Sequence, residues 1–158
     1  MSAISIRKAG PVDADGVLDC LRLAFEPYRD SYTPAAFQDT VLSADAVARR
    51  FTEMSVLVAT SEDGHIAGTI GYKVIDGREG HIRGMAVLPA HLGSGVAKRL
   101  LEAVETDLRQ AGCSLVSLDT TEPLQRAARF YERNGFRFSG IVRDFFGMRL
   151  LELTKRLE

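Results

Sequence analysis

The sequence has few cysteines and histidines, the residues that build disulfides and most transition-metal sites. Its two cysteines, Cys20 and Cys113, lie within apolar periodic segments and form no CxxC motif. We interpret both as small buried thiols rather than a disulfide or redox pair. The three histidines, His65, His81 and His91, are far apart in the sequence. No motif therefore predicts a metal site.

The chain also lacks a surplus of charge and any long apolar run. A formal net charge of −1 argues against nucleic-acid and anionic-membrane partners, because such binding needs surplus Lys and Arg. No segment approaches the ~20 consecutive apolar residues that span a bilayer. Residues 1–10 lack the apolar centre of a signal peptide. These absences predict a cytoplasmic protein without nucleic-acid or membrane partners.

What is present indicates a globular domain. The 158 residues are 46% hydrophobic and 26% charged, which predicts one domain over residues 1–158 with a core of ordinary size. Alternation of apolar and polar residues, or a short buried apolar run, predicts a series of strands. The expected strands are residues 4–8, 56–60, 66–75, 81–88, 115–118, 136–142 and 149–157.

Apolar residues at helical spacing predict four helices between these strands. The first helix follows residues 11–15, and the second runs from a Ser43 cap to Phe51. The third follows a glycine-rich loop at 93–95. The fourth begins at Thr120, Thr121 and Pro123 and ends at 134–135. Residues 25–33 are rich in aromatic residues, are interrupted by Pro27 and are bounded by Pro34, so they are expected to form a loop or a broken helix. A helix between strands 81–88 and 115–118 predicts one parallel crossover in an otherwise antiparallel sheet. The fold class is therefore α+β with a mixed sheet.

The glycine-rich loop lies where a strand gives way to a helix, in PAHLGSGVAKRLL, residues 89–101. Gly93 and Gly95 permit a positive φ and remove side chains that would hold a phosphate away from the backbone. The first N–H groups of a helix lack intrahelical partners and attract anions. Ser94 could add a hydroxyl donor, and Lys98 or Arg99 a positive charge. Tight packing alone is the alternative explanation of the loop.

A dinucleotide-binding loop is a second alternative. Gly93 and Gly95 supply the first two glycines of GxGxxG, and Asp119 follows at the distance of a ribose-binding acid. However, Lys98 stands at the third glycine position, and residues 89–92 separate the loop from its strand. This interpretation stays open as the weaker of the two phosphate-binding alternatives.

Two segments together resemble signatures of the GNAT superfamily of N-acetyltransferases. Residues 92–97, LGSGVA, resemble the acetyl-CoA motif Gln/Arg-x-x-Gly-x-Gly/Ala, and residues 127–136, AARFYERNGF, resemble AxxLYxxxGF. The order of the expected elements also matches that family along essentially the whole chain. The resemblance implies a mixed, mainly antiparallel central sheet flanked by helices on both faces.

The resemblance implies acetyl-CoA as co-substrate and no metal. Main-chain groups around Met85, Ala86 and Val87 are expected to pair with the pantetheine amides. The pyrophosphate site is expected at Leu92, Gly93, Ser94, Gly95, Val96, Ala97 and Lys98, with Tyr131 beside the sulfur. Leu92 departs from the Gln or Arg of the motif, and Leu124 replaces a frequent Asn whose role Gln125 could take. Neither change removes a backbone donor.

The expected reaction is direct transfer of the acetyl group to a primary amine of a small molecule or peptide, in a ternary complex. Tyr131 matches the family tyrosine that acts as general acid, because a phenol can protonate a departing thiolate. Its alternative role is core packing. The base is less defined: some branches use a glutamate where this chain has Arg83. His81 has the most suitable pKa, and an ordered water is an equal alternative.

The acceptor is expected to lie against aromatic residues after the first helix, Phe25, Tyr28 and Tyr32, with Phe37 as a further candidate. These rings, with Glu26 and Asp30, would suit a cationic amine; covering the sheet edge is the alternative. A non-catalytic acyl-CoA-binding or regulatory domain on the same fold is the alternative function. The resemblance is compatible with a homodimer, while the residues themselves leave the oligomeric state open.

Overall fold

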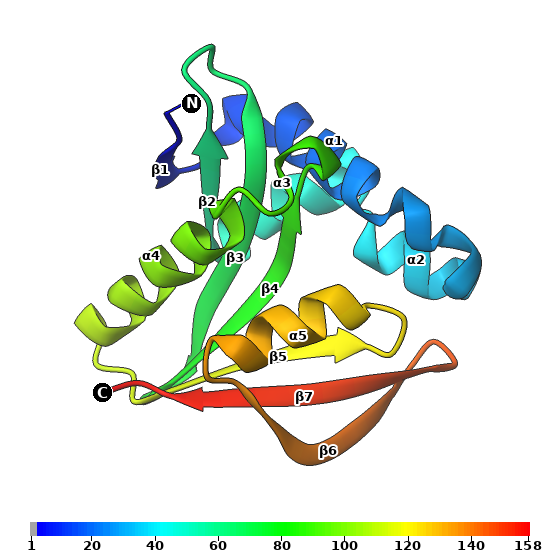
Figure 1. Cartoon of the computed structure of the whole chain (residues 1–158), viewed down its shortest axis with the longest axis vertical. Coiled ribbons are helices and arrows are strands. Elements are labelled where there is room, and N and C mark those ends of the chain that lie inside the picture. Colours follow the sequence, from blue (N-terminus) through cyan, green and yellow to red (C-terminus); the bar gives the residue numbers. More distant parts are fainter. Residues whose placement is uncertain (1–2) are drawn as a thin grey trace.

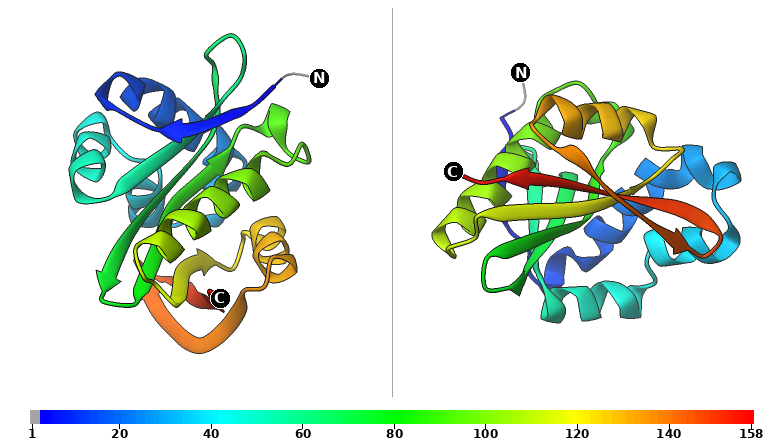
Figure 2. Two further views of the ribbon diagram at one scale, coloured as in Figure 1. Left: turned by 90° about the vertical axis from the view of Figure 1, so that its left-hand side faces the viewer. Right: turned by 90° about the horizontal axis from the view of Figure 1, so that it is seen from below.

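The computed structural model describes residues 3–158 as a twisted seven-stranded sheet with helices on both faces (Figures 1 and 2). The strand order is β1-β2-β3-β4-β5-β7-β6. The strands are β1 (Ser5–Lys8), β2 (Ser55–Thr60), β3 (Ile66–Asp76), β4 (Glu79–Val87), β5 (Leu115–Thr121), β6 (Arg137–Phe145) and β7 (Met148–Arg156). Only β4 and β5 pair in parallel within this sheet. The predicted α+β class is confirmed. The dinucleotide-binding alternative requires a doubly wound parallel sheet, which this mainly antiparallel sheet is not.

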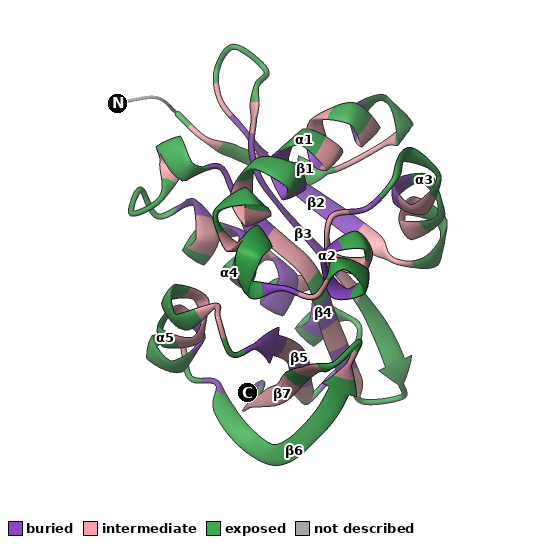
Figure 3. Cartoon of the chain, turned by 90° about the vertical axis from the view of Figure 1, so that its right-hand side faces the viewer, coloured by how far each residue is buried: buried purple, intermediate pink, exposed green. Residues whose placement is uncertain are grey.

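The helices divide between the two faces of the sheet. The α-helices are α1 (Ala14–Phe25), α2 (Pro34–Thr40), α3 (Ala44–Glu53), α4 (Val96–Gln110) and α5 (Gln125–Arg133). On one face α1 and α3 bury Val17, Leu21 and Val47 against the sheet. On the other, α4 and α5 contribute to the larger core cluster, which includes Leu100 and Tyr131. Figure 3 shows the buried residues gathered in the middle strands, while β6 is exposed along its length.

Two expectations for the helices were wrong. Helix α2 was not predicted, because Pro34 was interpreted as a helix breaker. The proline instead occupies the first turn, where its missing N–H is harmless, and Thr33 caps the helix by accepting from Ala36 N at 3.3 Å. Thr120 and Thr121 do not open a helix: both are buried at the end of β5, and α5 begins at Gln125. The Ser43 cap of α3 is confirmed.

Strands β4 and β5 separate at the centre of the molecule. Their pairing runs only from Glu79↔Leu115 to Ile82↔Leu118, although β4 continues to Val87 and β5 to Thr121. Beyond Ile82, β4 carries one residue more than β3 between their paired residues, a β-bulge that includes Gly84 at φ 72°. The bulge bends β4 away from β5 (Figure 1). The edge of β4 that faces β5 is therefore without a partner strand at this point.

Candidate active site

A groove with a volume of about 1340 Å³ passes through the gap between β4 and β5. It runs from the end of α1 and the adjoining 3₁₀ turn (Glu26–Ser31) to the glycine loop before α4 and the inner face of α5. Because side chains alternate along a strand, the two faces of the sheet give the groove two different halves. His81 and Arg83 lie on the face of α1, α2 and α3. Met85 lies on the face of α4 and α5.

The glycine loop has the geometry of an anion cradle. Gly93 and Gly95 adopt φ values of 78° and 87°, which side chains disfavour, and a Cβ atom at Gly95 would meet nothing within 4 Å. The first hydrogen bond into α4 is Arg99 N–H to Gly95 O at 3.1 Å. The N–H groups of residues 96–98 therefore have no intrahelical acceptor. These donors, the partial positive charge of the helix end and the open space fit the pyrophosphate of acetyl-CoA.

Side chains around this loop differ in their orientation. Lys98 lines the groove, whereas Ser94 does not, because its hydroxyl donates to the His91 carbonyl. The expectation that Arg99 brings a positive charge to the groove was wrong. Its guanidinium donates to the Ile4 carbonyl, away from the groove. Leu92 is 46% exposed. The remaining residues expected at the cofactor line the groove, namely Met85, Ala86, Val87, Leu92, Gly93, Gly95, Val96, Ala97 and Tyr131.

Arg126 is a groove residue that the sequence analysis missed. It lies in the first turn of α5, and its Nη2 atom would be 3.9 Å from a Cβ placed on Gly93. A guanidinium there faces the glycine loop from the opposite wall of the groove. It brings a positive charge to the loop in which Leu92 stands in place of the Gln or Arg of the motif. No local sequence signal identifies it, because the contact joins two segments far apart in the chain.

Tyr131 is buried where the groove passes between β4 and α5. Its hydroxyl donates to the Met85 sulfur at 3.2 Å, and its ring packs edge-on against Phe130 and Phe136. Burial raises the pKa of the phenol well above its usual range. The phenol is therefore protonated at neutral pH and is a hydrogen-bond donor in the groove.

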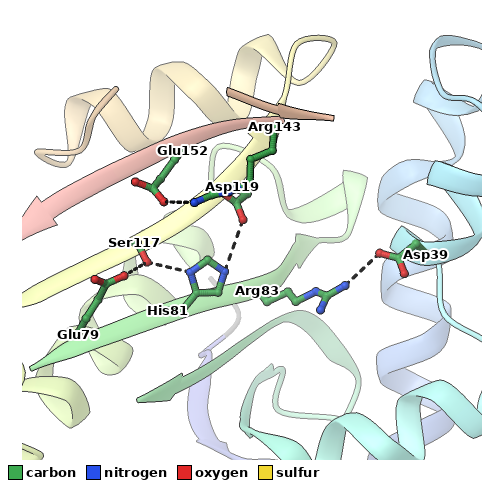
Figure 4. Close-up of polar contacts among 8 residues, drawn as sticks. All are labelled: Asp39, Glu79, His81, Arg83, Ser117, Asp119, Arg143 and Glu152. Atoms are coloured by element: carbon green, nitrogen blue, oxygen red, sulfur yellow. Dashed lines mark hydrogen bonds and ion pairs between the residues drawn. The ribbon is translucent and has the colours of Figure 1, made fainter. Parts of the chain in front are cut away.

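His81 belongs to a polar network that joins β4 to β5 (Figure 4). Its Nδ1 lies 2.8 Å from Ser117 Oγ, which in turn donates to a Glu79 carboxylate oxygen at 2.8 Å. Its Nε2 lies 3.7 Å from Asp119 Oδ2. Desolvation lowers the pKa of His81, and the Asp119 carboxylate opposes that shift. The imidazole is therefore neutral at pH 7 and can accept a proton.

Asp119 is shared between His81 and a cation. Arg143 lies 3.4 Å from Asp119 Oδ1 and 3.2 Å from Glu152 Oε2. Figure 4 shows these side chains reaching across β5 and β7 on one face of the sheet. The sharing fixes the orientation of the Asp119 carboxylate toward the imidazole. The sequence analysis predicted neither the contact between His81 and Asp119 nor the roles of Ser117 and Arg143.

The aromatic residues expected at the acceptor separate into two groups. Phe25, Tyr28 and Tyr32 line the groove. Phe37 instead packs edge-on against Tyr32, with its ring centroid 4.3 Å from the Arg29 guanidinium carbon. The Tyr32 hydroxyl is 2.6 Å from Thr121 Oγ1, which ties the 3₁₀ turn to the end of β5. Glu26 forms an ion pair with Arg29, so it is not free for a cationic acceptor.

Three further features of residues 3–158 concern the length of the helices, the grouping of possible metal ligands and the cysteines. None of the described helices is long and apolar enough to cross a membrane. Within the same residues, no three His, Cys, Asp or Glu side chains are grouped so that they could hold a metal ion. Both cysteines are free and buried, which confirms their interpretation as structural thiols.

The sequence matches a known family over most of its length: residues 17–136 match the Acetyltransferase (GNAT) family. The chain belongs to the GNAT acetyltransferase family. This is a family of acyltransferase enzymes that use acetyl-CoA. One relative is the aminoglycoside N(6')-acetyltransferase type 1 of Stenotrophomonas maltophilia, which is 33% identical to this chain over 127 residues. The alignment covers 75% of this chain and 76% of that enzyme. Protein YdhI of Bacillus subtilis is 33% identical over 92 residues, 58% of this chain and 56% of YdhI.

Solved structures share the same GNAT fold. The PaiA N-acetyltransferase of Thermoplasma acidophilum, solved in complex with coenzyme A, superposes with a TM-score of 0.79. The alignment covers 98% of this chain and 99% of that one, at 20% sequence identity. The GNAT-like sheet expected from the two sequence signatures is therefore confirmed.

Proposed function

We propose that this GNAT chain transfers an acetyl group from acetyl-CoA to a primary amine of a small molecule or peptide, by direct attack in a ternary complex. One observation carries the proposal. A single groove joins the amide-lined glycine loop to both Tyr131 and His81, through the gap between β4 and β5. Donor and acceptor could therefore enter from opposite faces of the sheet and meet in that gap.

The donor would be held mainly by backbone. The free N–H groups of residues 96–98 would bind the pyrophosphate, with the side chains of Lys98 and Arg126 adding charge. The edge of β4 from Met85 to Val87, left unpaired where β5 departs, would pair with the pantetheine amides. Since Leu92 has no polar atom on its side chain, it would contribute little. This division of roles predicts binding that depends on glycine at positions 93 and 95.

The proton transfers assign roles to two residues. An alkyl ammonium with a pKa near ~10 must lose a proton before its nitrogen can attack. His81 would accept that proton, directly or through a water. The amine nitrogen then bonds to the thioester carbonyl carbon, and a main-chain N–H of β4 would stabilise the oxyanion. When the carbon–sulfur bond breaks, the thiolate takes the Tyr131 proton. The nitrogen then loses its second proton, which returns to the Tyr131 phenolate through water, and His81 releases its proton to solvent. The products are an N-acetyl amine and CoA.

Binding and turnover experiments test the proposal in sequence. Calorimetry with acetyl-CoA should show micromolar binding. A thiol-release screen over polyamines, amino acids, aminoglycosides and N-terminal peptides should then find an amine that stimulates CoA release. Aminoglycosides are included because of the name of the Stenotrophomonas relative. Acetyl-CoA binding without release for any amine would contradict catalysis and favour an acyl-CoA-binding domain.

The remaining expectations stay predictions. We infer one domain over residues 1–158, which limited proteolysis would test by the absence of a stable smaller fragment. A homodimer is tested by light scattering at micromolar protein concentration. A monomer under those conditions would remove the homodimer from the account.

A further inference from the structure

Arg50 projects from the last turn of α3 toward the bulge in β4. A Cβ atom at Gly84 would clash with its Nη1, so the guanidinium lies directly against the bare backbone of that glycine. Arg50 also lines the groove, on the side of the sheet that carries His81. The position brings a fixed positive charge to the floor of the acceptor half of the groove.

This guanidinium has no partner in the part of the chain that the structure describes. It forms no hydrogen bond and no ion pair with residues 3–158, whereas neighbouring Arg83 pairs with Asp39 at 3.0 Å. Burial, and after it the charge of Arg83, lowers the pKa of Arg50 to about 10, which leaves it charged at pH 7. A partly desolvated charge without a counter-ion is unfavourable. A bound anion would remove that penalty.

The surroundings of Arg50 are cationic on balance. Arg83 and Lys73 line the same half of the groove, and Lys73 is the register partner of His81 across β3 and β4. The nearby carboxylates are Asp39, which is occupied by Arg83, and exposed Glu53. Figure 4 shows Arg83 extending from β4 toward Asp39, beside His81. Neither carboxylate pairs with Arg50.

The spacing relative to His81 sets the size of a ligand. His81 and Arg83 are two residues apart on one face of β4, which places their Cβ atoms roughly 6.6–6.8 Å apart along the strand. An amine beside His81 and an anionic group beside the arginines would thus belong to one short molecule.

We propose that the acceptor carries an anionic group, a carboxylate or phosphonate, a few bonds from its amine, and that Arg50, with Arg83 beside it, binds this group. The inference rests on the proposed transferase function and narrows its acceptor from amines in general to small zwitterionic amines. Phe25, Tyr28 and Tyr32 would then contact the carbon skeleton rather than a second cation. A polyamine is disfavoured, because its additional ammonium groups would approach Arg50.

The experiment compares matched acceptors in the CoA-release assay. The assay compares three kinds of acceptor at equal concentration. They are amino acids of two to four carbons with the amine at the α, β or γ position, the neutral amide of each amino acid, and 2-aminoethylphosphonate. We expect kcat/KM for the best anionic acceptor to exceed that for its amide by about tenfold or more. Comparison of kcat/KM between the amino acids and 2-aminoethylphosphonate shows whether the site prefers a carboxylate or a phosphonate. An amide or a polyamine as the best acceptor would overturn the proposal.

Variants separate recognition of the anion from folding. Arg50→Gln should remove the preference for the anionic acceptor, mainly through KM, and leave the amide within about twofold. Arg50→Lys should restore part of it, because the charge returns without the planar fork. Arg22→Gln, at an exposed ion pair on α1 outside the groove, is the charge-matched control. Equal losses for anionic and neutral acceptors in Arg50→Gln would contradict the assignment.

A failure of catalysis would be distinguishable from a failure of this inference. If no amine releases CoA, calorimetry of the same amino acids and 2-aminoethylphosphonate with the CoA-saturated protein still reports anion binding. Binding in the wild type that Arg50→Gln weakens about tenfold supports the site. No binding of any anionic amine overturns it. Arg50→Gln should leave the acetyl-CoA affinity unchanged, because the cofactor half of the groove lies on the other face of the sheet.

Discussion

The Tyr131 hydroxyl lies 3.2 Å from the Met85 sulfur, and so spans the groove between α5 and β4 at the gap in the sheet. A soft thioether is a weak acceptor. The phenol therefore loses little when it turns to a stronger acceptor such as a thiolate. Because burial raises the pKa of Tyr131, the phenol stays protonated at neutral pH and can donate to the departing thiolate.

The first prediction concerns this tyrosine. Tyr131→Phe should lower kcat by about 10²-fold and change the acetyl-CoA affinity much less, because only the hydroxyl is lost. Steady-state kinetics and calorimetry measure the two effects. Tyr72→Phe is the matched control, since its hydroxyl donates to Asp107 at 2.7 Å outside the groove. Wild-type turnover in Tyr131→Phe would remove this residue from the mechanism.

The second prediction concerns pH. If neutral His81 is the base, kcat/KM falls as the imidazole is protonated, at a pH below its ordinary value of 6.5 because burial lowers that pKa. The Asp119 carboxylate favours the protonated form, so Asp119→Asn should lower the pKa further and move the acid limb to lower pH. His81→Gln should abolish that limb. A limb that survives in His81→Gln would assign the base to another group.

The third prediction concerns the phosphates of the cofactor. Arg126→Gln should weaken acetyl-CoA binding by about tenfold, the effect of one charge-assisted contact. It should leave the binding of pantetheine, which lacks the pyrophosphate, unchanged. Arg129→Gln on the same helix, exposed and outside the groove, is the control. Equal weakening by the two substitutions would indicate a general electrostatic effect instead of a contact at Gly93.

The fourth prediction concerns stability. Arg7 on β1 donates two hydrogen bonds of 2.8 Å to Asp13, and Gly10 N–H adds another at 2.9 Å. These contacts lower the pKa of Asp13 from 3.8 to about 2. The folded state thus binds fewer protons than the unfolded state between these values, and the stabilisation present above pH 4 is lost as the pH falls toward 2.

Chemical denaturation of Arg7→Gln measures that contribution. We expect a loss of about 1–2 kcal/mol in the free energy of unfolding at pH 7, and a difference from wild type that shrinks between pH 4 and pH 2. Arg22→Gln, at an exposed pair, should cost less than about 1 kcal/mol. A difference that stays constant down to pH 2 would contradict the role assigned to the Asp13 carboxylate.

The strands in the centre of the sheet could be predicted from sequence because their apolar residues are strongly buried. Val56 to Thr60 shows this, since all five residues are buried. Where burial overrides local propensity, the prediction was wrong. Thr120 and Thr121 have helix-capping side chains and precede a proline, yet the sheet buries both. Pro34 was interpreted as a helix breaker beside a loop or broken helix, and it begins α2 in the structure. Local sequence does not distinguish these two roles without the Thr33 cap.

The site divides in the same way. The glycine loop and Tyr131 could be found from short motifs, because backbone conformation and a single phenol leave local signatures. Arg126, Ser117 and Arg50 could not, because each acquires its neighbours only when segments far apart in the chain are brought together. Arg50 is next to Gly84 in space but 34 positions away in the sequence.

The glycine loop provides the most direct test of the account. Gly95→Glu places a carboxylate in the cradle, where it would occupy the open space and repel the pyrophosphate. Gly64→Glu, at a hairpin glycine with a comparable φ of 83° and equally open surroundings, reproduces the backbone strain away from the groove. Calorimetric titration with acetyl-CoA should show no binding to Gly95→Glu, and wild-type affinity for Gly64→Glu and Leu92→Ala. Retained binding in Gly95→Glu, or its loss in Leu92→Ala, would contradict the central claim that main-chain groups of this loop hold the cofactor.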